Sequence, residues 1–329
     1  MKKEYIKNLL LNGQFQKFTK EAKKLDMNKH IETIICNVAC ETQNICAYGI
    51  ACYLNFLHET DNSYEQLKKI LDYAFSYLVG SYNCLFWYAI RRIELTPSNP
   101  FLYCLIFCIE DVYNLQNKVL SDEDKYELAQ TILRKWPEDD TANLQITYLK
   151  AKFNKNNIKP RLFVEKLTEK IIENKREAFK WLILEGRFAE SRLLLADFFE
   201  EEVEQVLREI ATESQSVCVY DYVWFWMRER CGESSKRHLL LADLTKIIFQ
   251  YQENGELKSY AGTKELYFFH VYRAAELSPD DIEIQEKLLS LYEVGNESFD
   301  VEETLQLTQR VFKQKPESAE AQRVFNLIK

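Results

Sequence analysis

The stretch Gly80–Pro97, GSYNCLFWYAIRRIELTP, carries the strongest structural signal in this chain because it occurs twice. The second version, Gly262–Pro279, reads GTKELYFFHVYRAAELSP. Both versions open with glycine and a small hydroxyl residue, pass through an aromatic helical run and stop at a proline, which breaks a helix. The two stretches predict two related helical halves in one chain.

Three further pairs of segments recur in the same order. They are Leu9–Phe15 with Leu182–Phe188, Ala39–Tyr48 with Ala211–Tyr220, and the acidic helices that end at Pro137 and Pro316. The second pair shares five of ten residues, where chance at ordinary composition gives about one. We therefore expect an internal duplication, with 1–150 as the first helical module, 151–173 as a basic connector and 174–329 as the second helical module. The second copy has its extra residues between Tyr220 and Gly262.

The composition agrees with a stack of helices. Apolar residues make up 47% and charged residues 29% of the 329 residues, as in ordinary soluble globular proteins. The chain has only 8 glycines and 6 prolines, too few for a β-sandwich with many turns. The predicted fold class is all-α, a tandemly duplicated α-helical solenoid of antiparallel helix pairs with essentially no β-sheet.

The sequence gives no sign of a membrane or secretory segment. A membrane-spanning helix needs about 18–20 apolar residues, and no window approaches that length. The N-terminal lysines precede an apolar run limited to Leu9–Leu11, and no small-residue cleavage site follows. We therefore expect a cytoplasmic protein with no membrane partner.

A basic segment, Leu149–Arg176, lies between the two predicted modules. It carries nine lysines and arginines against three glutamates. Such a segment either binds nucleic acid or presents its lysines to solvent as a connector. The net charge of −8 and the lack of arginines interleaved with aromatic residues favour the connector, so nucleic acid is not the expected partner.

The nine cysteines and four histidines show no spacing typical of a catalytic or metal site. Two cysteine pairs are four residues apart and so share a helix face, which fits either a metal or redox site or small core residues. Their apolar surroundings favour the core. We expect the following cysteines to be mostly buried, reduced and free of metal: Cys36, Cys40, Cys46, Cys104 and Cys108. The sequence also lacks a glycine-rich phosphate loop, so no catalytic residue, cofactor or metal is predicted.

Three aromatic runs are candidates either for the core or for the lining of a ligand groove. They are Phe86–Tyr88, Tyr220–Trp226 and Tyr267–Phe269. Consecutive aromatic residues surround a helix on all sides, which is typical of deep burial. We therefore expect these runs to lie in the core.

The phrase AAELSPDD at Ala274–Asp281 resembles the end of the second helix in a tetratricopeptide repeat, a family that stacks antiparallel helix pairs. Leu288 and Tyr292 then stand at the large positions of the following helix, whereas Leu289 replaces the usual glycine. Weaker forms of the phrase occur at Ile93–Asn99 and Arg134–Asp140, and the 34-residue period is not sustained. The resemblance implies tetratricopeptide-like helix pairs.

A narrower resemblance covers Asn62–Asn143. It is to a group of tetratricopeptide-like proteins of Gram-positive bacteria that carry the stretch G-A-Y-x-x-A-L-Y-H-A-R-K-A-I-E-L-x-P. The matching positions include Gly80, Tyr82, Arg91 and Pro97. Some members are encoded beside secreted polymorphic toxins, which implies an immunity role: a non-enzymatic protein-binding helical-repeat protein that neutralises such a toxin.

Two alternatives to immunity stay open. The first is a peptide-sensing tetratricopeptide regulator or adaptor, which requires a deep groove with convergent asparagine and arginine side chains. The second belongs to another class, an enzyme with an unrecognised site.

The densest acidic run, Asp197–Glu209 (DFFEEEVEQVLRE), supplies the candidate partner-binding residues. On a helix its apolar residues turn inward together, namely Phe198, Phe199, Val203, Val206 and Leu207. Glu200, Glu201 and Glu204 then project outward as a negative patch. Such a patch either attracts a basic partner, such as a basic toxin domain, or is an ordinary solvated face.

Overall fold

The structure is a computed structural model that describes residues 2–11, 18, 28–96, 126, 129–130, 133–134, 137–138, 175–253, 256–293 and 299–328. The basic connector predicted at 151–173 lies outside these residues, as do Cys104 and Cys108. Within the described residues, no helix is both long and apolar enough to cross a membrane.

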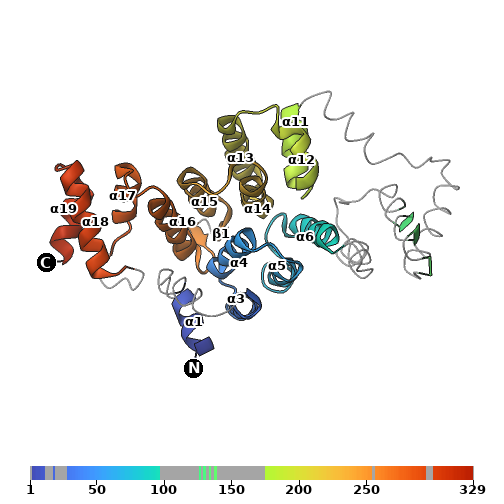
Figure 1. Cartoon of the computed structure of the whole chain (residues 1–329), viewed down its shortest axis with the longest axis horizontal. Coiled ribbons are helices and arrows are strands. Elements are labelled where there is room, and N and C mark those ends of the chain that lie inside the picture. Colours follow the sequence, from blue (N-terminus) through green and yellow to red (C-terminus); the bar gives the residue numbers. More distant parts are fainter. Residues whose placement is uncertain are drawn as a thin grey trace. The chain divides into compact units, whose positions relative to one another are not determined.

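Helices make up most of the described structure, which confirms the all-α class (Figure 1). The first group of helices is α1 (Lys2–Leu11), α3 (Asn28–Thr42), α4 (Ile45–Leu57), α5 (Asp61–Tyr73) and α6 (Ser81–Leu95). The second group is α11 (Lys175–Leu184), α12 (Phe188–Leu195), α13 (Glu200–Ser214), α14 (Val217–Trp226), a π-helical turn (Met227–Cys231), α15 (Ser235–Ile248), α16 (Thr263–Leu277), α17 (Ile282–Leu289), α18 (Val301–Gln314) and α19 (Ala319–Ile328).

The chain divides into two compact units. Unit 1 consists of Met1–His58, Ala211–Gln215 and Tyr220–Lys329, and unit 2 consists of Glu59–Ile210 and Ser216–Val219. Each unit therefore combines segments from both predicted halves of the sequence.

Both copies of the repeated stretch form helices of 15 residues, α6 and α16. Each helix follows a glycine in the left-handed region, Gly80 with φ 80° and Gly262 with φ 84°. A Cβ at Gly80 would lie 2.1 Å from Ser216 Oγ, and a Cβ at Gly262 would lie 2.0 Å from Asn44 Oδ1. The backbone angle and the close approach both require glycine at these two positions.

The turns that precede α4 and α14 match as well. Their backbones donate hydrogen bonds in the same way, from Ile45 to the Ala261 carbonyl at 2.8 Å and from Val217 to the Val79 carbonyl at 2.9 Å. The glutamines in these turns share a positive φ, 50° at Gln43 and 51° at Gln215. In each unit the turn from one half thus lies against the glycine of the other half. The duplication remains a proposal, and these matched geometries support it.

Most of the residues that were predicted to be buried lie in the core. Phe86–Tyr88, Tyr220–Trp226 and Tyr267–Phe269 are all buried, which confirms that prediction for the three aromatic runs. Cys36 and Cys46 are buried as predicted, whereas Cys40 is only half-buried.

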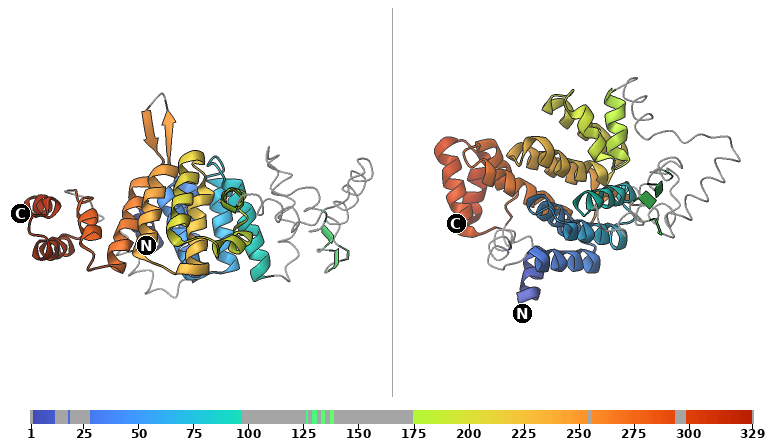
Figure 2. Two further views of the ribbon diagram at one scale, coloured as in Figure 1. Left: turned by 90° about the horizontal axis from the view of Figure 1, so that it is seen from above. Right: turned by 45° about the vertical axis from the view of Figure 1, so that its right-hand side comes forward.

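One element was not predicted, a small antiparallel hairpin of β1 (Gln250–Glu253) and β2 (Glu256–Ser259). It projects from the helices of unit 1 (Figure 2), and every residue of β2 is exposed. The hairpin lies between Tyr220 and Gly262, where the second copy of the sequence is longer than the first.

Candidate functional site

The predicted acidic patch lies at the start of α13, whose first turn contains Glu200 and Glu201. Glu201 is exposed, and Glu200 and Glu204 are half-buried. The opposite face is buried as predicted, at Val203, Val206 and Leu207. The structure therefore places the three predicted glutamates on one end of one helix. Whether they bind a partner remains a proposal.

The prediction for Phe199 is wrong, because its side chain is 77% exposed. Phe199 precedes the first residue of α13, and its backbone N–H donates to Glu202 Oε2 at 2.8 Å. Its side chain therefore falls outside the helical periodicity that turns the apolar residues inward. Phe198 instead stacks on Phe179, with ring centroids 5.2 Å apart.

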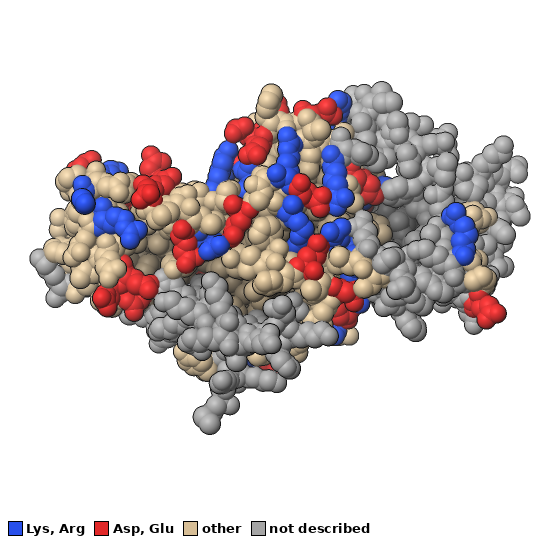
Figure 3. All heavy atoms as spheres, viewed as in Figure 1, with Lys and Arg blue, Asp and Glu red and all other residues tan. Residues whose placement is uncertain are grey.

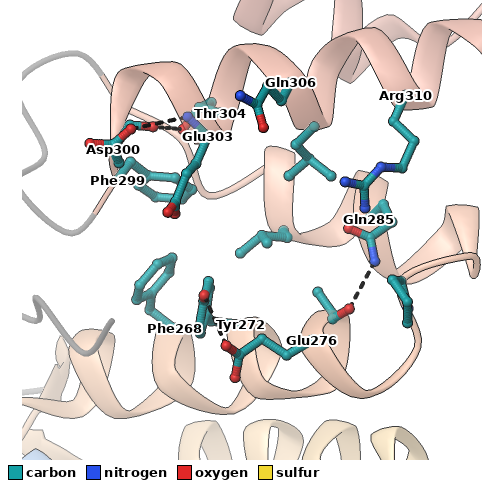
Figure 4. A pocket seen from close by; sticks show the side chains of 14 residues that line it. Phe268, Tyr272, Glu276, Gln285, Phe299, Asp300, Glu303, Thr304, Gln306 and Arg310 are labelled. Carbon is teal, nitrogen blue, oxygen red and sulfur yellow. Dashed lines mark hydrogen bonds between the residues drawn. The ribbon is translucent and has the colours of Figure 1, made fainter. Parts of the chain in front are cut away.

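A second candidate site is a cavity of about 270 Å³ in unit 1, between α16, α17 and α18 (Figure 4). Three of its lining residues, Phe268, Tyr272 and Glu276, recur every four positions along α16 and so share one helix face. Glu303, Leu307 and Arg310 are spaced by four and then three residues, so they lie on one face of α18. The cavity is thus lined by one face of α16 and one face of α18.

The cavity has an apolar floor and a charged rim. Phe268 and Leu288 are 7% and 5% exposed, whereas Glu276, Glu303 and Arg310 are exposed. Figure 4 shows the side chains of Glu276 and Glu303 entering from opposite walls near Phe268, with Arg310 at the other end. The cavity is therefore polarised, with carboxylates around its aromatic end and a guanidinium at the opposite end.

Glu276 is held in position by two donors on its own helix. The Tyr272 hydroxyl donates to Glu276 Oε1 at 3.1 Å, and Arg273 Nη1 donates to Glu276 Oε2 at 3.0 Å. Arg273 is fixed in turn by Glu233, through a bond from Nε of 2.8 Å and a bond from Nη2 of 2.9 Å. Such a bidentate pair restrains both groups. The rim carboxylate is therefore anchored to a half-buried ion pair.

This ion pair continues into a buried chain of polar side chains. His238 Nε2 lies 2.9 Å from Glu233 Oε1, His238 Nδ1 lies 3.1 Å from His270 Nδ1, and His270 Nε2 lies 2.8 Å from the Tyr220 hydroxyl. A carboxylate only accepts, so Nε2 of neutral His238 carries the proton. It follows that His270 donates from Nδ1 to His238, and that Tyr220 donates to His270. The network assigns one direction to every bond.

The pKa values fit this assignment. Burial lowers the pKa of His238 despite the opposing effect of Glu233, and burial together with His238 lowers the pKa of His270 well below its ordinary value. Both histidines are therefore neutral near pH 7. Burial alone would raise the pKa of Glu233, but hydrogen bonds from His238 and Arg273 lower it to about 2. The Glu233 carboxylate, which anchors Arg273, is thus an anion at physiological pH.

Charges on the described surface are otherwise mixed. On the face shown in Figure 3, basic and acidic side chains are interspersed over the coloured residues. No group of three or more metal-ligating side chains was found among the described residues. The coloured part of this face therefore carries both signs of charge.

The sequence predicted no cavity here: Phe268 was placed in an aromatic run, and Glu276 and Leu288 were named only for their resemblance to tetratricopeptide positions. The available signal was the four-residue spacing of Phe268, Tyr272 and Glu276. That spacing marks one helix face, but it does not show that α18 lies opposite.

Neither a scan of protein-family models nor a search of curated proteins found a match to this chain.

Proposed function

We propose that this chain is a non-enzymatic protein-binding helical protein whose partner is a basic protein. The cavity between α16 and α18 is the observation that carries the proposal, because it joins an apolar floor to three carboxylates, those of Glu276, Asp300 and Glu303. Interaction sites typically combine an apolar centre with a charged rim that selects the partner. A basic partner complements both features.

The acidic turn of α13 has a separate part in this proposal. Exposed charge mainly accelerates encounter with an oppositely charged protein, whereas contacts in a pocket slow its dissociation. We therefore assign Glu200, Glu201 and Glu204 to attraction of the partner and the cavity to its retention.

The partner proposed is a polymorphic toxin domain of the nuclease type, which makes this chain an immunity protein. The support is the resemblance of Asn62–Asn143 to toxin-associated tetratricopeptide-like proteins and the net charge of −8. Toxins that act on nucleic acid are commonly basic, so charge favours the pairing. In this proposal the duplicated helical solenoid is the scaffold that presents the binding surface.

A peptide-sensing regulator is the second candidate, favoured by one observation. Arg310 lies at one end of the cavity, where it could bind a carboxylate or carbonyl group of a peptide. The described lining, however, contains glutamines and no asparagine, so it meets the requirement of that alternative only in part.

The test of the proposal is co-expression of this chain with the product of any toxin-like gene that lies next to its own. Binding is measured at rising salt, for the wild type and for the Glu200→Lys/Glu201→Lys/Glu204→Lys variant. We expect a complex whose association rate falls with salt and falls further in the variant. A complete lack of binding would refute the immunity proposal. Unchanged binding of the variant would leave immunity standing and refute the role of α13.

A further inference from the structure

We propose that the aromatic end of the cavity receives one long cationic side chain, a lysine or an arginine, from the partner. This inference rests on the proposed function and specifies its chemistry. A lysine or arginine side chain has an apolar stem and a charged tip, and therefore needs a pocket that is apolar inside and acidic at its mouth.

The aromatic side chains form the apolar wall for such a stem. The rings of Phe268 and Phe299 lie 4.8 Å apart between centroids, and those of Phe268 and Tyr272 lie 6.0 Å apart. A cation near the face of such rings gains further attraction. The wall thus suits the stem and the charge of the same side chain.

The carboxylates stand where the charged tip would lie. Glu276 on α16 and Glu303 on α18 approach the aromatic end from opposite walls (Figure 4). Glu276 is already oriented by Tyr272 and Arg273, so binding costs little further ordering of this side chain. A cation between the two walls would be paired on both sides.

Gln285 places a hydrogen-bond acceptor on the wall of the cavity. It is 2% exposed and lines the cavity, and its amide nitrogen donates to the carbonyls of Ala275 at 3.1 Å and Ser278 at 3.0 Å. Figure 4 shows its carbonyl oxygen on the cavity side, and that oxygen accepts no hydrogen bond from the described residues. This oxygen is not among the buried side-chain atoms of the described residues that have no partner, so it is open to the cavity and can accept a hydrogen bond from a group that enters there. An ammonium or guanidinium group, or an amide beside it, supplies the donor for this bond.

Arg310 limits the cavity to a single cation. It lies at the end opposite Glu276 and repels a second positive group, while it attracts a carbonyl or carboxylate group of the same segment (Figure 4). The cavity therefore selects both the charge and the direction of the bound segment.

The experiment uses small probes and the full chain. Leucine methyl groups are labelled with ¹³C, and the signals of Leu288 and Leu307, which line the cavity, are followed by NMR. The probes are the acetylated amides of lysine, arginine and norleucine, the last having an aliphatic side chain without the ammonium group. We expect lysine or arginine amide to shift both signals saturably, with a dissociation constant on the order of 1 mM. Norleucine amide should bind at least about tenfold more weakly.

Matched variants locate the effect. Glu303→Gln should weaken the cationic probes about tenfold, whereas Glu302→Gln, which removes the same charge from an exposed neighbour outside the lining, should leave binding unchanged. Equal binding of norleucine and lysine amides, equal effects of the two variants, or no saturable shift would each overturn the inference. If the co-expressed partner still binds in those cases, only the inference fails and the proposed function stands.

Discussion

The helix pairs α5–α6 in unit 2 and α15–α16 in unit 1 contain the same ion pair in the same place. Glu59 and Glu233 each precede the N-cap of the first helix, Thr60 or Ser234. Each accepts two bonds from an arginine of the second helix, with distances of 2.7 and 3.0 Å from Arg91 and of 2.8 and 2.9 Å from Arg273. The pair fixes the start of one helix to the middle of the next.

The pairs differ in the third donor to the carboxylate. In unit 2 it is the Tyr64 hydroxyl, at 2.7 Å from Glu59 Oε1, and in unit 1 it is His238. The aromatic ring next to this donor differs as well. In unit 2 the ring centroids of Tyr64 and Tyr88 lie 5.7 Å apart, and in unit 1 those of His238 and His270 lie 5.3 Å apart. One architecture thus supports an uncharged tyrosine pair in one unit and a titratable histidine pair in the other. Only the histidine pair makes stability depend on pH near neutrality.

The largest loss of stability is expected when alanine replaces either of the two N-cap glycines. Gly80→Ala and Gly262→Ala each force a side chain into the left-handed region and against an oxygen about 2 Å away. Each should cost roughly 2–4 kcal/mol of unfolding free energy, as the sum of backbone strain and overpacking. Hydrogen exchange of the α6 and α16 amides measures this in each unit.

The control for this prediction is Gly80→Ala combined with Ser216→Ala, which removes the oxygen 2.1 Å from the new Cβ. Ser216→Ala alone loses the hydrogen bond that Cys218 N–H donates to this hydroxyl at 3.3 Å, so it serves as the reference. Relative to that reference, Gly80→Ala should cost only the backbone strain, without the overpacking part of the loss. If one glycine tolerates alanine and the other does not, the two helix starts are not equivalent.

The next effect tests the shared ion pair. Glu59→Gln and Glu233→Gln should each cost about 2 kcal/mol of unfolding free energy, because each removes the carboxylate that accepts two hydrogen bonds from a half-buried arginine. Denaturant unfolding measures this. Glu276→Gln is the control, since it also contacts Arg273 but is 42% exposed and should cost less than about 0.5 kcal/mol. A cost at Glu233 no larger than at Glu276 would contradict the anchoring role.

A smaller effect is expected in how the stability of the two helix pairs, α5–α6 and α15–α16, depends on pH. The folded pKa values of His238 and His270 are lowered, so the unfolded chain binds more protons than the folded chain below its ordinary histidine pKa of about 6.5. Stability of α15–α16 should therefore be full above that pH and fall below it. The pKa of Glu233 is lowered to about 2 in the folded chain. Its protonation therefore causes a further loss of stability only when the pH drops below the ordinary pKa of a glutamate.

The variant for this prediction is His238→Tyr/His270→Tyr, which copies the tyrosine pair of unit 2. Hydrogen exchange of α16, corrected for intrinsic rates, should then show stability that no longer changes between pH 7 and pH 5. A pH dependence equal to that of the wild type would place the titrating groups elsewhere.

The smallest effect concerns the hairpin that only α15–α16 carries. Replacement of Tyr251–Ser259 by two glycines should change the unfolding free energy by less than about 1 kcal/mol, since the loop is merely shortened and β2 is exposed. Thermal unfolding measures this. A larger loss would mean that the hairpin stabilises the helix pair.

The sequence was sufficient for features that depend on near neighbours in the chain. Gly80, Gly262 and the prolines that follow their helices marked the ends of α6 and α16, and the aromatic runs marked the core. The hairpin was missed although Asn254-Gly255, between its strands, is a strong turn signal. The short alternating segments beside it were outweighed by the helical pattern around them.

The candidate site could not be predicted in the same way. Phe268, Gln285 and Glu303 come from three helices, and only tertiary packing brings them to one cavity. The Glu233–Arg273 pair likewise joins residues 40 positions apart. Phe199 shows the reverse error, since the helical pattern was extended to residues that precede the actual start of α13 at Glu200.

The most direct test of the central claim compares the effects of two charge-reversal variants on the binding of one partner, the basic nuclease-type toxin domain proposed above. Dissociation rates are measured for the wild type, for Glu276→Lys/Glu303→Lys in the cavity, and for Glu200→Lys/Glu201→Lys/Glu204→Lys on α13. We predict that the cavity variant dissociates at least about tenfold faster, whereas the α13 variant mainly associates more slowly. A partner that dissociates from the cavity variant at the wild-type rate would contradict the claim that this cavity holds it.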